Sequence, residues 1–390
     1  YSTRGFFRFV PVRGTMAQHR SGDQPVRPTR RHVLLATASA LSAPHGSPHA
    51  QHAALSEHVP GSIWENVDLG ARGWSRTGRE EAREAARAMP PGSVFISEAG
   101  RKVLSWGDDS RRVKLSSVRK SFLSALFGTR IPEGRIHLDR NLAEIGIDDE
   151  PPLTATERTA TVRMLLQSRS GVFRPFVGGS LEQRARLPSP GSHAPGTFWY
   201  YNNWDFNALG TIYERLTEST IRDDFVDRIA KPVRMEDFRA EDMYYFRGSG
   251  IAAEQSIHPA YHFRMSARDA ARFGHLYLRR GAWNGRMLIP PEWIRESVTV
   301  HSAVGRGGYG YLWWIDDWPG VTVRSYSARG VLGKYICVIP DRDLVVVYLN
   351  HTDFPDDAAA LPREEVARLP RATSAQFGRF LSSVLAAQPS

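Results

Sequence analysis

The stretch 115-LSSVRKSFLSALFG-128 places a serine, Ser117, three residues before a lysine, Lys120. Residues three apart on a helix are neighbours one turn apart, so this spacing brings an amine within reach of a hydroxyl. The residues from Phe122 onward make the helix largely apolar, which favours burial of the lysine. Burial and nearby positive charge lower a lysine pKa, and a neutral lysine can take the proton of a serine nucleophile. The alternative is an ordinary core helix for which Ser117 is only the N-cap.

Ser116 is the rival serine of this stretch. Its partner three residues later is Arg119, whose guanidinium stays protonated and cannot act as a base. Ser117 is therefore the candidate nucleophile, and the N–H groups of the first helical turn could help to hold an oxyanion.

A second stretch, 195-PGTFWYYNNWDFNALG-210, passes from a Pro-Gly turn through aromatic and amide side chains into an apolar helix. Tyr201 and Asn203 lie two residues apart on this loop, and could supply a proton shuttle and a hydrogen-bonding amide to one cleft. Tyr200 and Asn202 share that spacing. The separation from the Pro-Gly pair favours Tyr201, and Tyr200 would then be a packing aromatic.

Segments rich in β-branched and aromatic residues cluster at both ends of the chain, and helix-like patterns lie between them. The expected strands are 93–97, 102–106, 309–314, 321–326, 334–339 and 344–349. The expected helices are 117–127, 155–167, 204–217, 221–230, 266–279, 291–296 and 373–387. The pattern predicts an α+β fold with an antiparallel sheet built from both chain ends and flanked by helices. Its cleft would lie between the sheet and a mainly helical insertion.

With these motifs in order, the chain resembles the superfamily of serine β-lactamases and penicillin-binding proteins. The similarity is to the class C-like branch of esterases, D-amino-peptidases and 6-aminohexanoate-oligomer hydrolases. That family carries Ser-x-x-Lys, then Tyr-x-Asn about 80 to 100 residues later, then a Lys-Thr-Gly-like strand. The resemblance runs from about 92 to 352, and includes 164-MLLQSRSGV-172, 266-SARDAARFG-274 and 328-ARGVLGKYICVIPDRDLVVV-347.

The resemblance implies a β-lactamase/transpeptidase-like fold and a role for each motif residue. Ser117 would be the nucleophile, Lys120 its base and Tyr201 the proton shuttle toward the leaving group. Asn203 would orient the substrate or Lys120. The catalytic domain would span 56–390, with the sheet region at about 56–116 and 255–390 and the helical insertion at about 117–254.

The third motif departs from the family, because Ala328-Arg329-Gly330 stands where a Lys or His, any residue and a Gly are expected. On a strand Ala328 and Gly330 face one way and Arg329 the other, so Arg329 does not simply replace the missing cation. The small residues still allow close backbone approach, and the N–H of Val331 is the expected second oxyanion donor beside that of Ser117. The loss of the cation weakens recognition of a substrate carboxylate, which β-lactams and peptidoglycan stems carry.

Other side chains are candidates for lining the cleft. His193 precedes the tyrosine motif, and Tyr200 and Arg329 lie beside the motif residues. His258 and His262 could touch substrate or merely pack, and the sequence does not decide between these roles. No metal-ligand cluster and no phosphate-binding glycine loop stands out, and the expected mechanism needs no cofactor.

The net charge of +10 and pI of about 9.9 raise the question of nucleic acid. The body of the chain has no long basic run, no zinc-ligand spacing and no RNA-recognition motif, so we expect no nucleic-acid partner. The one cysteine, Cys337, allows no intrachain disulfide. No segment approaches the 18 or so consecutive apolar residues that a membrane-spanning helix needs.

The first 55 residues read as a disordered leader that stays outside the core. In 29-TRRHVLLATASALSA-43 two arginines precede a short apolar run, which is typical of a twin-arginine export signal. The sequence therefore predicts a periplasmic or extracellular protein, and a cytoplasmic protein with a plain basic leader is the alternative.

Together these features predict a serine hydrolase that cleaves a small-molecule amide or ester through an acyl-enzyme. A β-lactamase or D-amino/D,D-peptidase on the same site is one alternative. A peptide-binding protein that keeps the fold but has weakened turnover is another, and the altered third motif is its best support.

Overall fold

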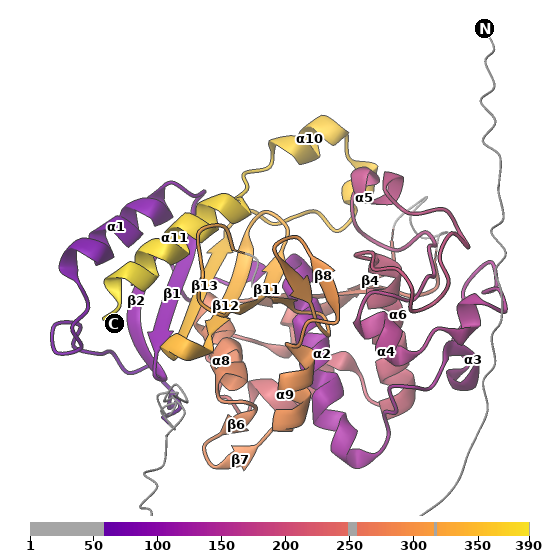
Figure 1. The fold of residues 1–390 in the computed structure, drawn as a ribbon, viewed down its shortest axis with the longest axis horizontal. Helices are drawn as coiled ribbons and strands as arrows, with labels where there is room; N and C mark the ends of the chain where they lie inside the picture. Colours follow the sequence, from indigo (N-terminus) through magenta and orange to yellow (C-terminus); the bar gives the residue numbers. More distant parts are fainter. Residues whose placement is uncertain (1–57, 249–255, 316–317, 390) are drawn as a thin grey trace, which may run out of the picture. The chain divides into compact units, whose positions relative to one another are not determined.

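An antiparallel sheet joins segments from the two ends of the chain, as Figure 1 shows in the computed structural model. The structure describes residues 58–248, 256–315 and 318–389. The strand order is β2-β1-β13-β12-β11-β10-β9-β8. The strands are β1 Gly92–Glu98, β2 Arg101–Trp106, β8 Ser302–Val304, β9 Gly307–Tyr309, β10 Trp314–Ile315, β11 Tyr326–Gly330, β12 Lys334–Ile339 and β13 Leu344–Asn350. The predicted α+β class is confirmed.

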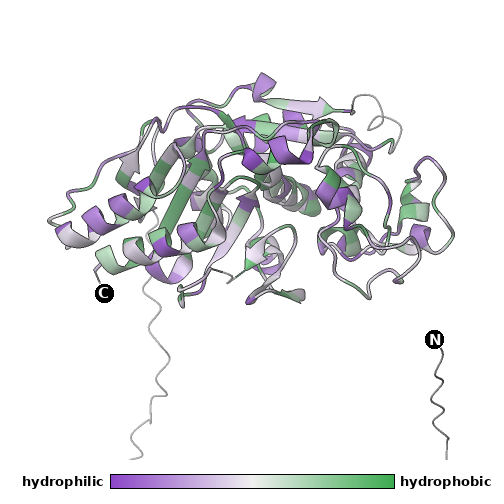
Figure 2. Cartoon of the chain, turned by 90° about the horizontal axis from the view of Figure 1, so that it is seen from above, coloured by the Kyte–Doolittle hydropathy of each residue, from purple (hydrophilic) through white to green (hydrophobic). Residues whose placement is uncertain are grey.

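Helices cover both faces of this sheet. Helices α1 (Arg76–Arg87) and α11 (Ser374–Ala387) lie side by side over one face, and α8 (Ala267–Leu278) packs on the other (Figure 1). Alternate residues of β13 therefore enter two separate cores, with Val346 in one and Val345 in the other. Figure 2 shows the hydrophobic colour concentrated in the strands that the helices enclose. Burial on both faces explains why β13 is a continuous apolar run.

Helix α2 (Arg119–Arg130) runs through the middle of the helical region, and all of its residues are buried. The helices around it include α3 Leu142–Ile145, α4 Val162–Leu166, α5 Leu181–Ala185, α6 Asn203–Thr217, α7 Ile221–Phe225 and α9 Pro291–Ser297. A small sheet of β3 (Val113–Lys114), β5 (Ala260–Met265) and β4 (Met243–Phe246) lies beside its start. A two-stranded ribbon, β6 Ala282–Trp283 and β7 Arg286–Met287, precedes α9, and helix α10 (Arg363–Arg368) follows β13.

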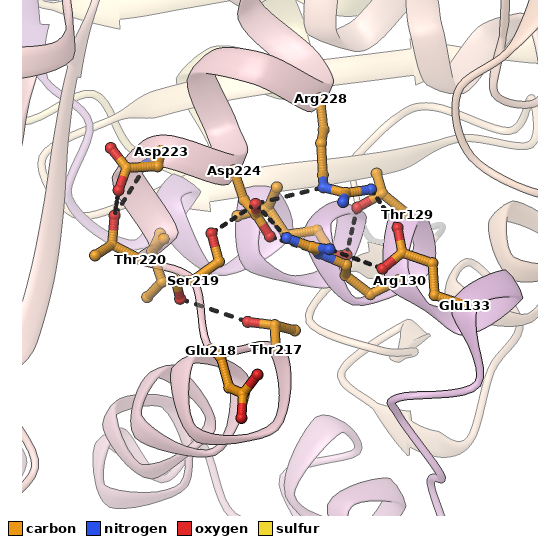
Figure 3. Close-up of polar contacts among 12 residues, drawn as sticks. Thr129, Arg130, Glu133, Thr217, Glu218, Ser219, Thr220, Asp223, Asp224 and Arg228 are labelled. Atoms are coloured by element: carbon orange, nitrogen blue, oxygen red, sulfur yellow. Dashed lines mark hydrogen bonds and ion pairs between the residues drawn. The ribbon is translucent and has the colours of Figure 1, made fainter.

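An ionic cluster holds the far end of α2. Arg130 donates to both carboxylate oxygens of Asp224, through Nε at 2.7 Å and Nη2 at 2.5 Å, and its Nη1 donates to Glu133 at 2.7 Å. Arg228 contacts both carboxylates, and Ser219 donates to Asp224 (Figure 3). Because this cluster ties α2 to α7, it fixes the helix whose other end carries the Ser-x-x-Lys motif.

Three predicted elements are wrong in extent. The strand expected over 309–314 is interrupted, because Leu312 has a φ of 65° and its N–H donates to the carbonyl of Leu166 instead of a strand neighbour. The strand expected over 321–326 instead starts at Tyr326, where its pairing with Ile315 of β10 and Val338 of β12 begins.

The helix expected over 155–167 is also wrong, because it splits into a 3₁₀ turn, Glu157–Thr159, and α4. Ala160 has extended dihedral angles, and Thr161 forms a β-bridge with Asn141 before capping α4.

The leader predicted over residues 1–55 lies outside the described residues. Within the described ranges, no helix combines the length and apolarity needed to cross a bilayer.

Candidate active site

The chain makes a strained turn just before α2. Ser116 has a φ of 52°, in the left-handed region that non-glycine residues rarely adopt. A 3₁₀ turn over Ser116–Val118 follows, and α2 begins at Arg119. The N-cap position of α2 is Val118, and no side chain caps this helix. The hydroxyl of Ser117 is thus not engaged as a cap, which was the alternative role for this residue.

The amine of Lys120 lies at the centre of a cluster of polar groups. Its Nζ is 2.7 Å from Ser117 Oγ, 2.9 Å from Tyr201 Oη and 3.0 Å from Asn203 Oδ1. The lysine is buried, and this burial is the main reason why the pKa of Lys120 lies well below its ordinary value. The positive charge of Arg119 lowers the pKa further. A buried lysine that is neutral near pH 7 can accept the proton of Ser117.

The loop that carries Tyr201 is pinned from both sides. The hydroxyl oxygen of Ser168 accepts a hydrogen bond from the N–H of Asn202 at 3.1 Å. The carbonyl oxygen of Ser168 accepts one from the N–H of Tyr200, also at 3.1 Å. The side chain of Asn202 donates to the carbonyl of Val172 and accepts the N–H of Trp204, which starts α6. Asn202 is therefore the helix cap, so Tyr201 and Asn203 are the two side chains left to face Lys120.

Tyr200 and His193 have packing roles. The ring of Tyr200 meets Phe173 edge-on at 5.9 Å, and its hydroxyl lies 3.4 Å from the carbonyl of Gln183. The ring of His193 stacks on Phe198 at 3.9 Å. Neither residue contacts the Lys120 cluster in the hydrogen bonds and ring contacts of the described chain.

Burial sets the proton state of Tyr201. It raises the pKa of this phenol to about 12, although the hydrogen bond with Ser117 and the charge of Arg119 act in the opposite direction. The phenol is therefore protonated at neutral pH, with a proton available to give.

Strand β11 approaches the turn before α2 very closely. A Cβ atom at Gly330 would lie 2.4 Å from the carbonyl oxygen of Leu115, so only glycine allows this contact. Val331, the next residue, lines the same cavity as Ser117. The glycine of the altered third motif thus keeps the backbone of β11 beside the serine.

Arg329 points away from this cavity. Its guanidinium lies 3.8 Å from the ring of Trp318, and its Nε donates to Ser327 Oγ at 2.8 Å. The amine of Lys334, which is paired with Gly330 across the strands, donates to the carbonyl of Thr352 at 2.6 Å. Neither side chain supplies the cation that the third motif lacks.

A cavity of about 460 Å³ opens beside Ser117. Ser117, Lys120, Asn203 and Val331 line one side of it, whereas His193, Tyr200 and Arg329 are not among its lining residues. Apolar side chains from 177–181 and from 354–367, including α10, form other parts of its wall. Across the described ranges, no group of three or more His, Cys, Asp or Glu side chains is placed to hold a metal ion.

Sequence reasoning assigned no definite role in the site to two polar lining residues. Arg119 was considered only as a failed base, and His262 was left undecided between substrate contact and packing. Both line the cavity. The signal for Arg119 was a second charged residue directly before Lys120 at the start of the same helix, and His262 sits on a strand whose neighbours are mostly apolar. The walls from 177–183 and 354–371 gave no signal.

Comparisons with known proteins agree with this architecture. The family model described as Beta-lactamase matches residues 77–369. An uncharacterised protein of Alkalihalophilus pseudofirmus is 21% identical over 255 residues, which are 60% of this chain and 71% of that protein.

Solved structures with the same fold have low sequence identity. A candidate 6-aminohexanoate-dimer hydrolase from Bacillus anthracis aligns with a TM-score of 0.59 at 18% identity, over 86% of this chain and 90% of its own. A penicillin-binding protein homologue from Caulobacter crescentus aligns with a TM-score of 0.57 at 15% identity, over 83% and 99% of the two chains. With the family model spanning most of the chain, the protein belongs to the beta-lactamase family of the serine hydrolase superfamily.

Proposed function

We propose that the protein hydrolyses an amide or ester bond through an acyl-enzyme on Ser117. The observation that carries the proposal is the buried amine of Lys120, 2.7 Å from Ser117 Oγ. The described residues place no carboxylate in contact with this amine, so its environment disfavours the charged form. A lysine kept only for structure would be better placed with its charge in water or in an ion pair.

Acylation follows from these positions. Lys120 accepts the hydroxyl proton as Ser117 Oγ bonds to the substrate carbonyl carbon, and the backbone N–H groups of Ser117 and Val331 hold the oxyanion. The bond to the leaving group then breaks. The leaving nitrogen or oxygen takes a proton from Tyr201, which regains one from the Lys120 ammonium 2.9 Å away.

Deacylation reverses the proton transfers. Water attacks the acyl carbonyl carbon as Tyr201 accepts its proton and passes the phenolic proton to neutral Lys120. The bond to Ser117 Oγ then breaks, and Ser117 Oγ takes a proton from the Lys120 ammonium. The products are the free acid and the amine or alcohol, and no cofactor takes part.

The altered third motif supports simple amides and esters over β-lactams. A cation beside Gly330 would bind the carboxylate that β-lactams carry, and neither Arg329 nor Lys334 is placed to do so. We therefore rank short amides and oligoamides first, carboxylic esters second and β-lactams third.

A hydrolysis panel tests the proposal. Short 4-nitroanilides, 4-nitrophenyl esters and a chromogenic β-lactam are assayed with the wild-type protein and with Ser117→Ala. We expect turnover of an ester or amide that the Ser117→Ala variant loses while its circular dichroism spectrum is unchanged. Turnover that persists in the variant would refute the role of Ser117. Absence of turnover by folded wild-type protein would favour the peptide-binding alternative.

A further inference from the structure

Arg119 carries a buried positive charge on the wall of the cavity. The residue is 5% exposed and lies between Val118 and Lys120 on the turn that bears the nucleophile. Its Nη2 donates to Asn207 Oδ1 at 3.1 Å, and its guanidinium lies 4.2 Å from the ring of Tyr261. Its Nη1 is buried and makes no hydrogen bond of good geometry with the described residues, although the Tyr261 hydroxyl interacts with the guanidinium, and no described carboxylate forms an ion pair with it. A buried charge without a counter-ion is strongly destabilising.

The other cations around the cavity are already neutralised or hydrated. Lys114 forms an ion pair with Asp356 and donates to the carbonyl of Phe354 at 2.7 Å. Arg363 and Arg371 are exposed to solvent on the far wall, where a charge is hydrated and attracts an anion only weakly. Arg119 thus differs from them, because it combines burial with a free donor.

His262 lies on the same wall and offers a second set of hydrogen-bonding atoms. It is 8% exposed, and neither ring nitrogen makes a hydrogen bond within the described chain. Nε2 lies 3.3 Å from Asp356 Oδ1 without hydrogen-bond geometry. Burial is the main cause that holds the pKa of His262 well below its ordinary value, and the positive charges of Arg119, Lys114 and Lys120 lower it further. The imidazole is therefore neutral and can donate one hydrogen bond to an anion.

We propose that Arg119 is a specificity residue that binds a carboxylate in the acyl part of the substrate, with His262 as a second donor. The preferred substrates would be half-acids, that is, monoesters or monoamides of a dicarboxylic acid. This inference rests on the proposed function and names its substrate class. A carboxylate accepts hydrogen bonds from a guanidinium in a planar, charge-assisted geometry, and it would neutralise the buried charge.

The lining of the cavity places this carboxylate on the acyl side. Tyr201, which serves the leaving group, is not among the lining residues, whereas Asn203 is. The apolar walls, which include Val177, Leu181 and Val366, suit a hydrocarbon spacer between the two carbonyl groups. The cation therefore comes from the nucleophile's own helix, at a different position from the cation that the third motif lacks.

A matched substrate pair tests the inference. Mono-4-nitrophenyl adipate carries a free carboxylate, and methyl 4-nitrophenyl adipate is its neutral counterpart. The ratio of their kcat/KM values is measured for wild type, Arg119→Met, Arg119→Lys and the exposed control Arg286→Met. Any effect of Arg119 on the pKa of Lys120 changes the kcat/KM values of both substrates by the same factor and therefore cancels in the ratio. We expect wild type and the control to favour the half-acid by about tenfold or more.

The variants separate charge from geometry. Arg119→Met should lose the preference, mainly through KM of the half-acid, and Arg119→Lys should keep part of it. Equal kcat/KM values for the two substrates in wild type would overturn the inference even if Arg119→Met fails to fold. In that case hydrolysis of the neutral ester would still support the proposed function.

A binding measurement makes the inference independent of turnover. Isothermal titration calorimetry with the Ser117→Ala variant compares monomethyl adipate with dimethyl adipate. Binding of the anionic half-ester that Arg119→Met abolishes supports the carboxylate site, even if the wild-type protein proves to have no hydrolase activity. Equal or undetectable binding of both compounds would overturn it.

Discussion

The three oxygen atoms within 3.0 Å of Lys120 Nζ belong to Ser117, Tyr201 and Asn203, and none of them is a carboxylate oxygen. Two aromatic rings, those of Tyr201 and Phe206, lie 4.6 Å from the same amine. Such rings offer weak attraction to a cation but cannot replace its hydration. At the scale of the residue, the surroundings of Lys120 lower the pKa of its amine beside the hydroxyl of Ser117.

The first prediction concerns the pH dependence of kcat/KM for a neutral ester. Only neutral Lys120 can accept the serine proton, so activity should rise with pH through the pKa of Lys120. Burial and the charge of Arg119 lower that pKa, so the midpoint should lie well below about 10.4. Arg119→Met removes a lowering charge and should move the midpoint to higher pH, whereas Arg119→Lys should move it less. A midpoint unaffected by Arg119→Met would contradict this electrostatic account.

The second prediction concerns the proton shuttle. Tyr201→Phe keeps the ring but removes the hydroxyl 2.9 Å from Lys120 Nζ. We expect kcat to fall by about 10² or more with little change in KM, since a positioned acid–base group contributes about 10²–10⁴. Tyr200→Phe is the matched control, because its hydroxyl is remote from this cluster, and it should retain near wild-type rates. Equal losses in both variants would contradict the choice of Tyr201.

At the scale of the elements, local signals predicted the motif-bearing segments well. Strands β1, β2, β12 and β13 and helices α6, α8 and α11 lie close to where alternation, helical periodicity and turn residues place them. Strand β11 was misplaced, because its extent depends on pairing with β10 and β12, and that is a long-range property. The break before the short helix starting at Val162 was missed for a similar reason, since the Asn141–Thr161 bridge interrupts the helix predicted over 155–167.

The third prediction tests the contact between β11 and the turn before α2. Gly330→Ala puts a Cβ 2.4 Å from the carbonyl oxygen of Leu115 and should push the N–H of Val331 away from the oxyanion. We expect phosphonylation of Ser117 by a fluorophosphonate to slow by about 10² or more, the usual effect of losing one oxyanion donor. Gly61→Ala controls for the substitution itself, because a Cβ at Gly61 would lie 3.9 Å from the carbonyl oxygen of Ile63, an ordinary contact. Intact-mass spectrometry over time measures both rates, and wild-type labelling by Gly330→Ala would contradict the role of this contact.

At the scale of the whole molecule, the site depends on a helix that is fixed at both ends. The Ser-x-x-Lys motif lies at the start of α2, and the cluster of Arg130, Asp224 and Glu133 lies at its end (Figure 3). The sequence predicted Ser117, Lys120, Tyr201 and Asn203 as a group, because each belongs to a motif with fixed spacing. Arg119 and His262 belong to no such motif, since their environment is created by segments far apart in the chain.

The fourth prediction concerns the cluster at the end of α2. Removing one partner of a buried ion pair leaves the other uncompensated, so Arg130→Met should lower the free energy of unfolding by about 3 kcal/mol. Arg158→Met removes a half-exposed pair with Asp148 and should cost under about 1 kcal/mol. Urea denaturation at pH 7 measures both, and equal effects would contradict the buried character of the cluster.

The same cluster predicts an acid dependence of stability. Burial alone would raise the pKa of Asp224, but the hydrogen bonds from Arg130, Tyr213 and Ser219 and the charge of Arg130 together outweigh it and leave the pKa below its ordinary value. A lowered folded-state pKa stabilises the protein above about pH 3.9, the unfolded value, and that contribution is lost as the pH falls through the folded-state pKa. Asp224→Asn should therefore show a weaker loss of stability between pH 5 and pH 3 than wild type.

The most direct measurement of the central claim is intact-mass spectrometry after incubation with a fluorophosphonate and, separately, with a penicillin. Wild type and Ser117→Ala are compared, and the labelled peptide is identified after digestion. The account predicts one fluorophosphonate adduct on wild type, located on Ser117 and absent from the variant. Labelling by penicillin as well would move β-lactams up the ranking of expected substrates. Folded wild-type protein that takes up no adduct from either reagent, or a Ser117→Ala variant that is still labelled, would contradict the claim that Ser117 is an activated nucleophile.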